Sequence, residues 1–545
     1  MTPFTSDELE VRFPLDGRSI RVRAGSTVMD AALLAGVWID APCGGEGRCG
    51  KCRVKLSGET APPTAEELEH LSPDDLGGEI RLACQAVVTG PLNVEPTGVV
   101  AWASAKTSLL GQATLAVDLP GVRTKTFAAH PLGAALDAGT TTLCVSLIDL
   151  TNGERLAVAS AENPQTRLGA DVMTRIERCR SDPRCLSEMY SGVTTSFNEL
   201  LADVTAKAGR TPADIVRMVA VGNTTMIHLL IGEDPSPLGS YPFEPPVLGP
   251  VDIPASSIGI EAADGARFLA PRFLSGFLGA DIVAVILASG MDRSADDCLV
   301  VDLGTNGEIA MGNRNRMAAC STAAGPAFEG MQISSGMRAV RGAIESLSRD
   351  GLLLPRVLGG GEPEGICGSG LMDAVAALLE AGLLKPSGRL KPPADSEGTA
   401  AGRIRDSDSM REFVLAPGYD VTLTQKDIRE FQLAKGAVRS GIDVLASRLS
   451  LDYEKLARVF LAGVFGNFLK PASAVAVGLF PEALKGRIDF AGNAAVLGAE
   501  MMLASEREWK RALDIAEAVE VVELSGDPLF DKEFIGNLAF PAVSS

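Results

Sequence analysis

Residues 41–59 read APCGGEGRCGKCRVKLSGE and residues 81–88 read RLACQAVV, and these two stretches decide the fold of the N-terminal part of the chain. They contain four cysteines with the spacing C-x5-C-x2-C-x31-C, namely Cys43, Cys49, Cys52 and Cys84. Four thiolates that converge from a glycine-rich loop and one later segment are typical ligands of a two-iron, two-sulfur (2Fe-2S) cluster. The glycines of the loop allow a tight turn that directs backbone N–H groups toward the sulfur atoms.

A zinc ribbon is the alternative interpretation of four such cysteines. Structural zinc sites usually combine two C-x2-C pairs. Here only one such pair, Cys49 and Cys52, is present, and it lies inside the glycine-rich loop. The pattern therefore favours the 2Fe-2S cluster.

The segments around the cysteines predict a small sheet crossed by a helix. Leu9–Phe13 and Ser19–Arg23 alternate in polarity around an Asp-Gly turn, which is typical of a β-hairpin. Thr27, followed by Asp30, predicts a helix cap before VMDAALLAGV. CRVKLSGE (52–59) predicts a further strand and turn after the cysteine loop, and RLACQAVVTGPLNVEP (81–96) completes the sheet. The expected fold of this part is a β-grasp. Over residues 8–95 the chain resembles plant-type and adrenodoxin-type ferredoxins, and its x5 spacing is similar to the adrenodoxin class.

Composition limits the partners and the compartment. A chain of 545 residues is expected to contain about three or four structural units. The net charge of −19 argues against nucleic acid, because phosphate contacts need a basic face, and it is compatible with a protein partner. The N-terminus lacks the features of a signal peptide, and no apolar run approaches the ~20 residues of a membrane span. We therefore expect a cytoplasmic protein that binds neither nucleic acid nor membrane.

The remaining cysteines are scattered, as is usual in a reducing compartment. They are Cys144, Cys179, Cys185, Cys298, Cys320 and Cys367. Cys179 and Cys185 have the spacing of half a metal site, but no second pair follows them. Buried thiols are the preferred interpretation.

A phosphate-binding hairpin is predicted by LGAALDAGTTTLCVSLIDL, residues 132–150. An Asp, a Gly and three threonines lie between two apolar runs. Such a turn offers backbone N–H groups and hydroxyls to phosphate oxygens, and the Asp is placed to hold a hydrated metal ion. In a single copy, a plain surface hairpin is an equal alternative. The residues concerned are Asp137, Gly139, Thr140, Thr141 and Thr142.

The same pattern returns in LVVDLGTNGEIAMGN, residues 299–313. Its residues are Asp302, Gly304, Thr305, Asn306 and Gly307. Two such hairpins are expected to face each other across a cleft and to hold the phosphates from both sides. This arrangement resembles the superfamily of acetate and sugar kinases, heat-shock chaperones and actin.

The other elements of that superfamily follow in order along the chain. SGFLGADIVAVILASG (275–290) is similar to the helix that joins the two lobes, and GNAAVLGAEMM (492–502) resembles the second such helix. VFLAGVFGNFL (459–469) looks like the strand and turn that hold adenosine through Gly463 and Gly466. No Walker A sequence competes with this assignment. ATP binding is therefore expected.

The combination of the two parts resembles the ATP-dependent reductive activators of corrinoid-dependent enzymes. The matching motifs include NPQTRLGADVMTRI, VGNTTMIHLLIG, AGPAFEG and ICGSGLMDAV, so that the likeness spans nearly the whole chain. The expected fold is α/β multidomain. It comprises a β-grasp ferredoxin domain (1–95), a linker (96–131) and a two-lobed actin/sugar-kinase-like ATPase domain (132–545). The linker is too short for the extra middle domain that some relatives carry before the ATPase. No cysteine follows Cys367, so a single cluster is expected.

This resemblance implies a function and a partner. Such activators return an inactive Co(II) corrinoid to Co(I) on a corrinoid protein or methyltransferase. The electron comes from a ferredoxin, a flavodoxin or a reductase, passes through the 2Fe-2S cluster, and is driven uphill by ATP hydrolysis. A homodimer is compatible with the family. The alternatives are an activator of a non-corrinoid enzyme and a metabolite kinase with a redox-sensing ferredoxin domain.

The resemblance also assigns roles within the ATPase site. Asp137 and Asp302 are expected to position Mg²⁺, and the hydroxyl and amide side chains of the two turns to contact phosphates. Asp281 or Glu308 is expected to orient the attacking water, with a solvated or helix-capping carboxylate as the alternative for each.

Other residues have weaker indications of function. Each of His70, His130 and His228 is a candidate cobalt ligand, although the apolar run IHLLIG favours a packed core histidine at position 228. The hydroxyls of Ser321 and Thr322 are candidates to face the corrinoid. ICGSG indicates a close backbone approach rather than a reactive Cys367.

Overall fold

The computed structural model describes residues 8–14, 18–35, 37, 39, 47, 50, 52–96, 115–119, 130–304, 306–406, 410–463 and 469–542. The chain divides into two compact units, each built from segments that are distant in the sequence. The first unit comprises Met1–Leu109, Thr322–Gly492 and Ser525–Ser545, and the second comprises Leu110–Ser321 and Asn493–Leu524.

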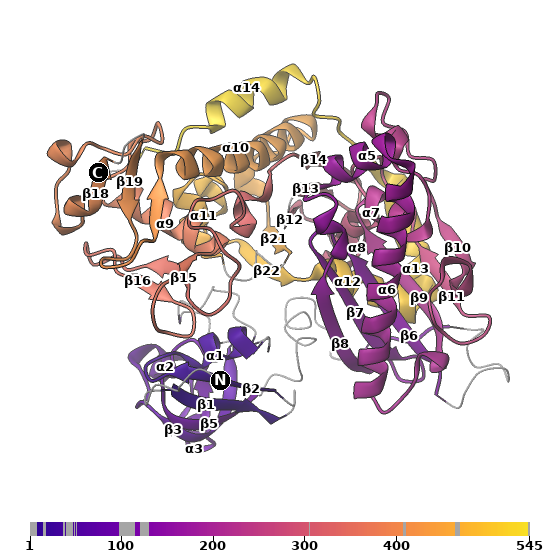
Figure 1. Cartoon of the computed structure of the whole chain (residues 1–545), viewed down its shortest axis with the longest axis horizontal. Coiled ribbons are helices and arrows are strands. Elements are labelled where there is room, and N and C mark those ends of the chain that lie inside the picture. The colour runs from indigo at the N-terminus through magenta and orange to yellow at the C-terminus, as the bar shows by residue number, and fades with distance from the viewer. Residues whose placement is uncertain are drawn as a thin grey trace. The chain divides into compact units, whose positions relative to one another are not determined.

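The N-terminal part of the first unit is the expected β-grasp (Figure 1). Its sheet has the order β2-β1-β5-β3-β4, in which β1 runs parallel to β5 and antiparallel to β2. Val11 and Phe13 of β1 are fully buried, as the alternating pattern predicts. The strands are β1 (Glu8–Phe13), β2 (Arg18–Arg23), β3 (Arg53–Thr60), β4 (Ile80–Leu82) and β5 (Val88–Pro96), and the helix between β2 and β3 is α1 (Val28–Ala35).

The caps of the helices explain where they begin. Before α1, the backbone N–H of Thr27 donates to the Asp30 carboxylate at 2.9 Å, and the N–H of Asp30 donates to the Thr27 hydroxyl at 3.1 Å. This confirms the predicted cap. Two short helices, α2 (Ala65–His70) and α3 (Pro73–Gly77), lie between β3 and β4 and were not predicted. Each begins with a complete capping box, at Thr64 and Ser72, and that pattern is visible in the sequence.

The remainder of the first unit combines short strands with helices, of which α10 (Gln425–Arg448) is the longest. β15 pairs antiparallel with β16 and parallel with β17, β21 runs parallel to β22, and α10 packs against α14. α10 begins at a capping box between Thr424 and Asp427. The elements are β15 (Ala343–Leu347), β16 (Pro355–Val357), β17 (Gly365–Ile366), α9 (Gly368–Glu380), β18 (Ile404–Asp406), β19 (Arg411–Val414), β20 (Thr422–Thr424), α10 (Gln425–Arg448), β21 (Arg458–Ala462), α11 (Pro471–Ala476), β22 (Ile488–Gly492) and α14 (Pro528–Asn537).

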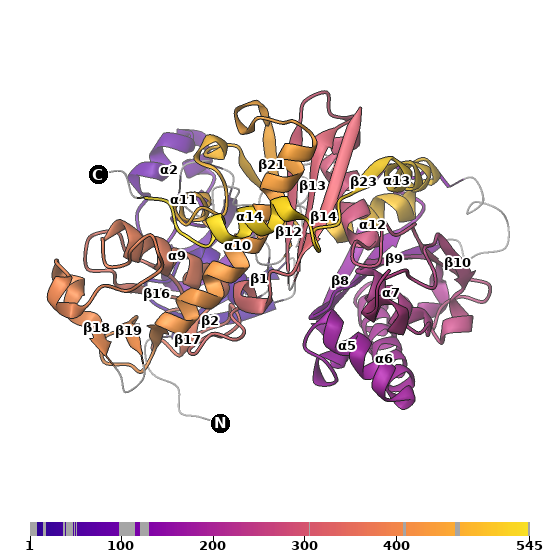
Figure 2. The ribbon, with the colours of Figure 1, turned by 90° about the horizontal axis from the view of Figure 1, so that it is seen from above.

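The second unit contains a mixed sheet of order β10-β11-β9-β6-β7-β8. β6, β7 and β8 form an antiparallel meander, and β9 is parallel to β6. Figure 2 shows α5 and α6 on one face of this sheet and α12 and α13 on the other. The elements are β6 (Leu132–Ala138), β7 (Thr142–Asp149), β8 (Arg155–Glu162), α5 (Val172–Ser181), α6 (Pro183–Lys207), β9 (Ile215–Gly222), α7 (Thr224–Ile231), β10 (Val251–Pro254), β11 (Arg267–Ala270), α8 (Ala280–Ser289), α12 (Ala494–Ala504) and α13 (Glu506–Ala518).

A second group of strands in this unit carries the other predicted hairpin. β12 pairs antiparallel with β13, β14 follows β13 in the sheet, and β23 runs parallel to β14. These strands are β12 (Cys298–Leu303), β13 (Gly307–Asn313), β14 (Arg316–Thr322) and β23 (Val519–Val521).

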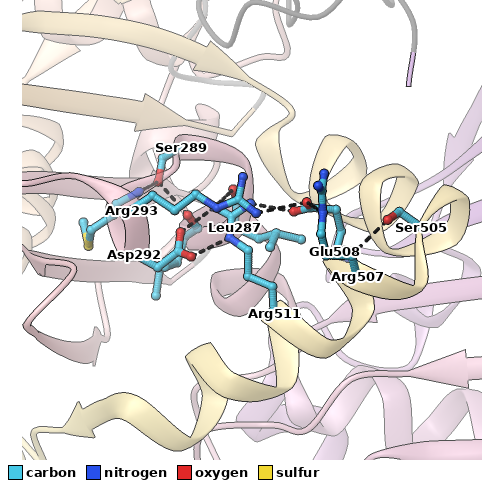
Figure 3. A network of polar contacts seen from close by, with 10 residues as sticks. Leu287, Ser289, Asp292, Arg293, Ser505, Arg507, Glu508 and Arg511 are labelled. Atoms are coloured by element: carbon cyan, nitrogen blue, oxygen red, sulfur yellow. Dashed lines mark hydrogen bonds and ion pairs between the residues drawn. The ribbon is translucent and has the colours of Figure 1, made fainter. Parts of the chain in front are cut away.

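A buried ionic network joins α13 to the end of α8 (Figure 3). The Arg511 guanidinium pairs with Asp292 at 2.5 Å and with Glu508 at 2.6 Å, and it also donates to the Leu287 carbonyl at 3.1 Å. Arg293 pairs with the same Glu508 at 3.0 Å. Each buried carboxylate therefore has a cation, which is the condition under which buried charges are tolerated.

The helices that the structure describes include none with the length and apolar character needed to cross a bilayer.

Candidate functional site

The two predicted phosphate-binding hairpins place their aspartates alike but differ in the pairing of their strands. Residues 139–141 lie between β6 and β7, and residues 304–306 lie between β12 and β13. The last cross-strand pair is Ala138 with Leu143 in the first hairpin and Leu303 with Gly307 in the second, so the first turn is one residue longer. In both hairpins the aspartate lies two residues before the first turn residue, as Asp137 and Asp302. Both hairpins belong to the second unit, so this unit holds both aspartates in one body.

The second hairpin places two carboxylates directly opposite each other. Asp302 of β12 is the cross-strand partner of Glu308 of β13, whereas Asp137 of β6 has Cys144 as its partner. Glu308 is buried, with 9% of its surface exposed, and it accepts a hydrogen bond from the Asn306 side chain. Within the part of the chain that the structure describes, no cation contributes to the electrostatics of either carboxylate.

Four carboxylates of the second unit influence one another electrostatically. Burial, and then the charges of Asp281 and Asp137, raises the pKa of Asp302 to about 7. Burial and the charge of Asp137 raise the pKa of Asp281 to about 7, against the opposing effect of the Ile282 N–H. Burial, together with Asp281 and Asp302, also raises the pKa of Glu308 well above its ordinary value. The cluster therefore carries more negative charge than its surroundings stabilise.

A bound Mg²⁺ would relieve this repulsion, and the donor set is suited to it. Mg²⁺ prefers oxygen ligands and commonly keeps several waters while binding one or two carboxylates and substrate phosphates. Among the described residues, no three Cys, His, Asp or Glu side chains lie close enough to hold one ion directly. The carboxylates thus fit a hydrated ion shared with a nucleotide rather than a protein cage.

Asn493 connects the first hairpin to α12 and was missed from the sequence. Its side-chain amide donates to Asp137 at 3.1 Å, and its side-chain oxygen accepts from the Val496 N–H at 2.9 Å as the N-cap of α12. The residue therefore fixes one oxygen of Asp137 from a position 356 residues later in the chain. An Asn immediately before an apolar helix was the available signal.

The structure describes the predicted phosphate-binding residues of both turns apart from Thr305. Thr140 and Thr141 are half-buried, and Thr142 is exposed at the start of β7. A side chain at Gly139 would place its Cβ 2.4 Å from the Thr142 carbonyl oxygen, so the tight turn requires glycine there. In the other turn the Gly304 N–H donates to the Asn306 carbonyl at 3.0 Å. Thr305 lies outside the described residues.

The two predicted joining helices are α8 and α12, and they pack closely on each other. A side chain at Gly498 of α12 would place its Cβ 2.2 Å from the Ala284 carbonyl oxygen of α8. Gly463 of the first unit follows β21 with φ +89° and donates to the Gly492 carbonyl at 3.1 Å. Gly466 lies outside the described residues.

Two of the four predicted cluster ligands are described, and they converge. The sulfur atoms of Cys52 and Cys84 lie 3.2 Å apart, too far for a disulfide, and both residues are buried. Gly47 and Gly50 of the cysteine loop have φ of +78° and +62°, the conformation for which glycine was expected. The thiol pair fits one edge of a 2Fe-2S site. Cys43 and Cys49 lie outside the described residues.

His228 is a packed core histidine, as expected. It is fully buried, its Nδ1 contacts the Thr224 carbonyl at 2.7 Å, and its Nε2 accepts from the Val247 N–H at 3.1 Å. Because both ring nitrogens are used, His228 does not serve as a cobalt ligand. His130 lies 4.0 Å from Asp149 in an exposed position.

The remaining candidates have mainly structural contacts. Cys367 is buried at the N-cap of α9, and a side chain at Gly370 would place its Cβ 2.0 Å from the Ile344 carbonyl oxygen, which confirms the close backbone approach. Cys179 and Cys185 are both buried. Burial raises the pKa of Cys179 to about 12, as expected for a core thiol. Of the residues suggested to face a corrinoid, Thr322 is buried and Ser321 is half-buried.

Comparisons with known proteins agree with this architecture. Residues 13–89 match the 2Fe-2S iron-sulfur cluster binding domain, residues 132–294 match the RACo middle region, and residues 296–545 match the C-terminal ASKHA domain of RACo. The second and third matches divide residues 132–545, for which the sequence predicts a single ATPase domain, into a middle region and a C-terminal ASKHA domain.

Full-length relatives carry the same combination. The chain is 30% identical to the "corrinoid activation enzyme RamQ" of Eubacterium limosum, over 98% of this chain and 99% of that protein. It is 26% identical to the "Co(II) methylated amine-specific corrinoid protein reductase" of Methanosarcina barkeri, over 69% and 70% of the two chains. The solved structure of a "reductive activator for corrinoid,iron-sulfur protein" matches with a TM-score of 0.70 and 27% identity, over 98% and 99% of the chains. The chain therefore belongs to the RACo family of corrinoid activation enzymes.

Proposed function

We propose that this chain is an ATP-dependent reductive activator that returns the Co(II) corrinoid of a methyltransferase system to Co(I). The observation that carries the proposal is the presence, in one chain, of a converging buried thiol pair in a β-grasp and of two matched Asp-x-Gly hairpins. The likeness to corrinoid activation enzymes over nearly the full chain supports it. We assign residues 1–95 to the ferredoxin domain, 96–131 to a linker and 132–545 to the ATPase domain.

The two parts have complementary tasks. When bound, the 2Fe-2S cluster would supply a one-electron relay, and Cys43, Cys49, Cys52 and Cys84 would hold it. Reduction of Co(II) by ordinary electron donors is thermodynamically unfavourable. For a one-electron transfer, each tenfold change in the equilibrium constant corresponds to a difference of about 59 mV in reduction potential. ATP hydrolysis helps only if the nucleotide favours one conformation of the protein over another. The ATPase domain therefore binds and releases the corrinoid partner in step with its nucleotide state.

The residues of the second unit divide the work of ATP hydrolysis. Asp137 and Asp302 position a hydrated Mg²⁺, and Asn493 keeps Asp137 in place by its 3.1 Å hydrogen bond. The turn residues, Thr140 and Thr141 on one side and Thr305 and Asn306 on the other, bind phosphate oxygens. Gly463 and Gly466, which belong to the first unit, keep in this proposal the adenosine-binding role that the sequence resemblance assigns.

Glu308 is the better of the two candidates to activate water. It is buried, it lies opposite Asp302, and its raised pKa makes it a stronger proton acceptor than an exposed glutamate. Asp281 occupies the first turn of α8, where its Oδ1 accepts from the Ile282 N–H at 2.8 Å. We assign Asp281 to the positioning of Mg²⁺-bound water.

The partner set follows from the same proposal. The chain would take electrons from a ferredoxin, a flavodoxin or a reductase in the cytoplasm and act on a corrinoid protein. Its net charge of −19 would favour partners that present a basic patch. A homodimer is compatible with this activity.

A spectroscopic assay tests the proposal. The cluster-loaded protein is mixed with a Co(II) corrinoid protein, a reductant and Mg-ATP, and the visible spectrum is followed. We expect the Co(I) band to form with ATP and not with a non-hydrolysable analogue. The Cys84→Ser variant serves as the control for electron transfer. Absence of Co(I) with corrinoid partners, accompanied by phosphorylation of a small molecule, would favour the metabolite kinase instead.

A further inference from the structure

One segment holds all three carbonyls of the first phosphate turn. The Asn163 side-chain amide donates to the Gly139 carbonyl at 2.9 Å, and the Asn163 backbone N–H donates to the Thr141 carbonyl at 2.9 Å. Between them, the guanidinium of Arg175 donates to the Thr140 carbonyl at 2.6 Å. Asn163 follows β8 and Arg175 belongs to α5, and both lie in the motif NPQTRLGADVMTRI that has no role in the proposed reaction.

These bonds decide which way the turn presents its polar groups. In a trans peptide the C=O and the following N–H point in opposite directions. Since the carbonyls of Gly139 and Thr140 point toward Asn163 and Arg175, the N–H groups of Thr140 and Thr141 point to the opposite side. Carbonyl oxygens repel a phosphate and N–H groups attract it. The contacts of Asn163 and Arg175 therefore direct the turn's carbonyls to their own side. The N–H groups of Thr140 and Thr141 are left on the opposite side, where they can attract a phosphate.

Arg175 is itself an unusual residue in this position. It is fully buried, and its guanidinium also donates to the Gly169 carbonyl at 2.9 Å and to Gln165 at 3.1 Å. A side chain at Gly169 would place its Cβ 2.9 Å from the Arg175 side chain, so glycine is required there to admit the arginine. Among the described residues, no carboxylate forms an ion pair with Arg175, whose neighbours are neutral acceptors.

A buried cation without an anion is costly, and an anionic ligand reduces that cost. Burial lowers the pKa of Arg175 to about 10, and the charge of Asp171 opposes this effect only in part, so the side chain stays protonated near neutral pH. Its positive charge lies one hydrogen bond behind a turn whose N–H groups face the other way. Such charge, placed before the ligand arrives, costs no rearrangement when the ligand binds.

We propose that Arg175 and Asn163 are positioning residues for the nucleotide phosphates, acting through the Gly139–Thr141 turn. This inference rests on the proposed ATP site. Arg175 binds the Thr140 carbonyl and contributes a buried positive charge. Asn163 binds the carbonyls of Gly139 and Thr141. Neither residue contacts the nucleotide.

Substitution of Arg175 in the full-length, cluster-loaded protein tests this role. Arg175→Met keeps an unbranched apolar stem and removes the guanidinium with its donors and charge. We expect it to raise the Kd and the KM for Mg-ATP by about tenfold or more, the size of a lost hydrogen bond to a charged group, with a smaller change in kcat. Arg175→Lys restores the charge without the planar fork, and we expect it to recover part of the affinity. The cluster absorption should not change in either variant.

Arg178→Met is the matched control, because Arg178 lies on the same helix, is exposed and donates only to the Leu168 carbonyl in the described structure. It should bind ATP as the wild type does. If Arg175→Met binds Mg-ATP within about twofold of the wild type, the inference is wrong. If Arg175→Met does not fold, Arg175→Lys decides, and an unchanged KM in that variant also overturns the inference. Failure of the wild type to bind ATP would instead overturn the proposed function.

Discussion

Asp302 and Glu308 lie directly opposite each other in the β12–β13 ladder. Like charges at opposed positions of an antiparallel pair are destabilising. Here burial and the neighbouring carboxylates raise the pKa of both Asp302 and Glu308. The hairpin therefore keeps a repulsive pair at a place where two uncharged residues would give a more stable ladder. Under the proposed function, the Mg²⁺ that accompanies ATP would reduce the repulsion within this pair.

Replacement of Glu308 should separate stability from activity. We expect Glu308→Gln to raise the free energy of unfolding of the metal-free protein by about 0.2–1 kcal/mol, because the repulsion with Asp302 is removed. The same change should lower ATP hydrolysis by roughly 10²–10⁴-fold through loss of the proton acceptor. Thermal unfolding without Mg²⁺ and a phosphate-release assay measure the two effects. Glu188→Gln, on the exposed face of α6, should change neither. Hydrolysis at the wild-type rate by Glu308→Gln would assign the water to another group.

The bond between Asn493 and Asp137 can be tested with little effect on the fold. In Asn493→Asp the new carboxylate still caps α12, because it accepts from the Val496 N–H as the amide oxygen does now. It cannot donate to Asp137, and it repels that residue instead. We expect an unchanged helix content and a KM for Mg-ATP raised by about tenfold, since a hydrogen bond to a charged group is lost. Asn493→Ser, which caps without charge, should give a smaller loss. Equal KM values in the three proteins would show that Asp137 needs no support.

Sequence patterns predicted what depends on neighbours in the chain. The Thr27 cap of α1, the β1–β2 pair and both Asp-x-Gly hairpins follow from residues a few positions apart, and the structure confirms them. The same local rules also identify α2, because the capping box at Thr64 is formed by residues three positions apart. These features were accessible because a hydrogen bond between near neighbours fixes each one.

Contacts between distant residues could not be predicted in this way. Arg175 reaches the Thr140 carbonyl across 35 positions, and Asn493 reaches Asp137 across 356. An arginine in an amphipathic helix is ordinarily exposed, so no pattern distinguishes Arg175 from Arg178. The packing of α5 and the glycine at position 169 allow Arg175 to be buried, whereas Arg178 stays at the surface. Supporting residues of the site therefore required the three-dimensional structure.

The cluster cysteines should separate electron transfer from nucleotide binding. Cys84→Ser leaves Asp137 and Asp302 untouched, since Cys84 belongs to the first unit and the two aspartates to the second. We expect loss of the cluster's visible absorption and of Co(I) formation, with a Kd for Mg-ATP equal to that of the wild type. Cys144→Ser, at a buried cysteine of β7, is the control and should retain the cluster. Retention of the cluster in Cys84→Ser would contradict the ligand assignment.

Lys435 should make the stability of the first unit depend on pH. Its ammonium group is buried, donates to the carbonyls of Asn537 and Ala539, and lies 5.2 Å from the ring centre of Phe540. Burial, and then the charge of Arg439, lowers its pKa from 10.5 to about 7. Between these two values the unfolded chain binds one more proton than the folded chain, so the free energy of unfolding rises with pH across that window.

The comparison of wild type with Lys435→Met measures this effect. The variant lacks the titrating group, so the Tm of the wild type should rise progressively relative to that of the variant as the pH increases from about 7 to about 10. Below pH 7 both states of the wild type hold the proton, and the difference should be constant. Lys426→Met, at an exposed position of the same helix, should follow the wild type throughout. A Tm difference that is independent of pH would show that Lys435 keeps its charge when buried, because the carbonyls and Phe540 would then stabilise the ammonium as well as water does.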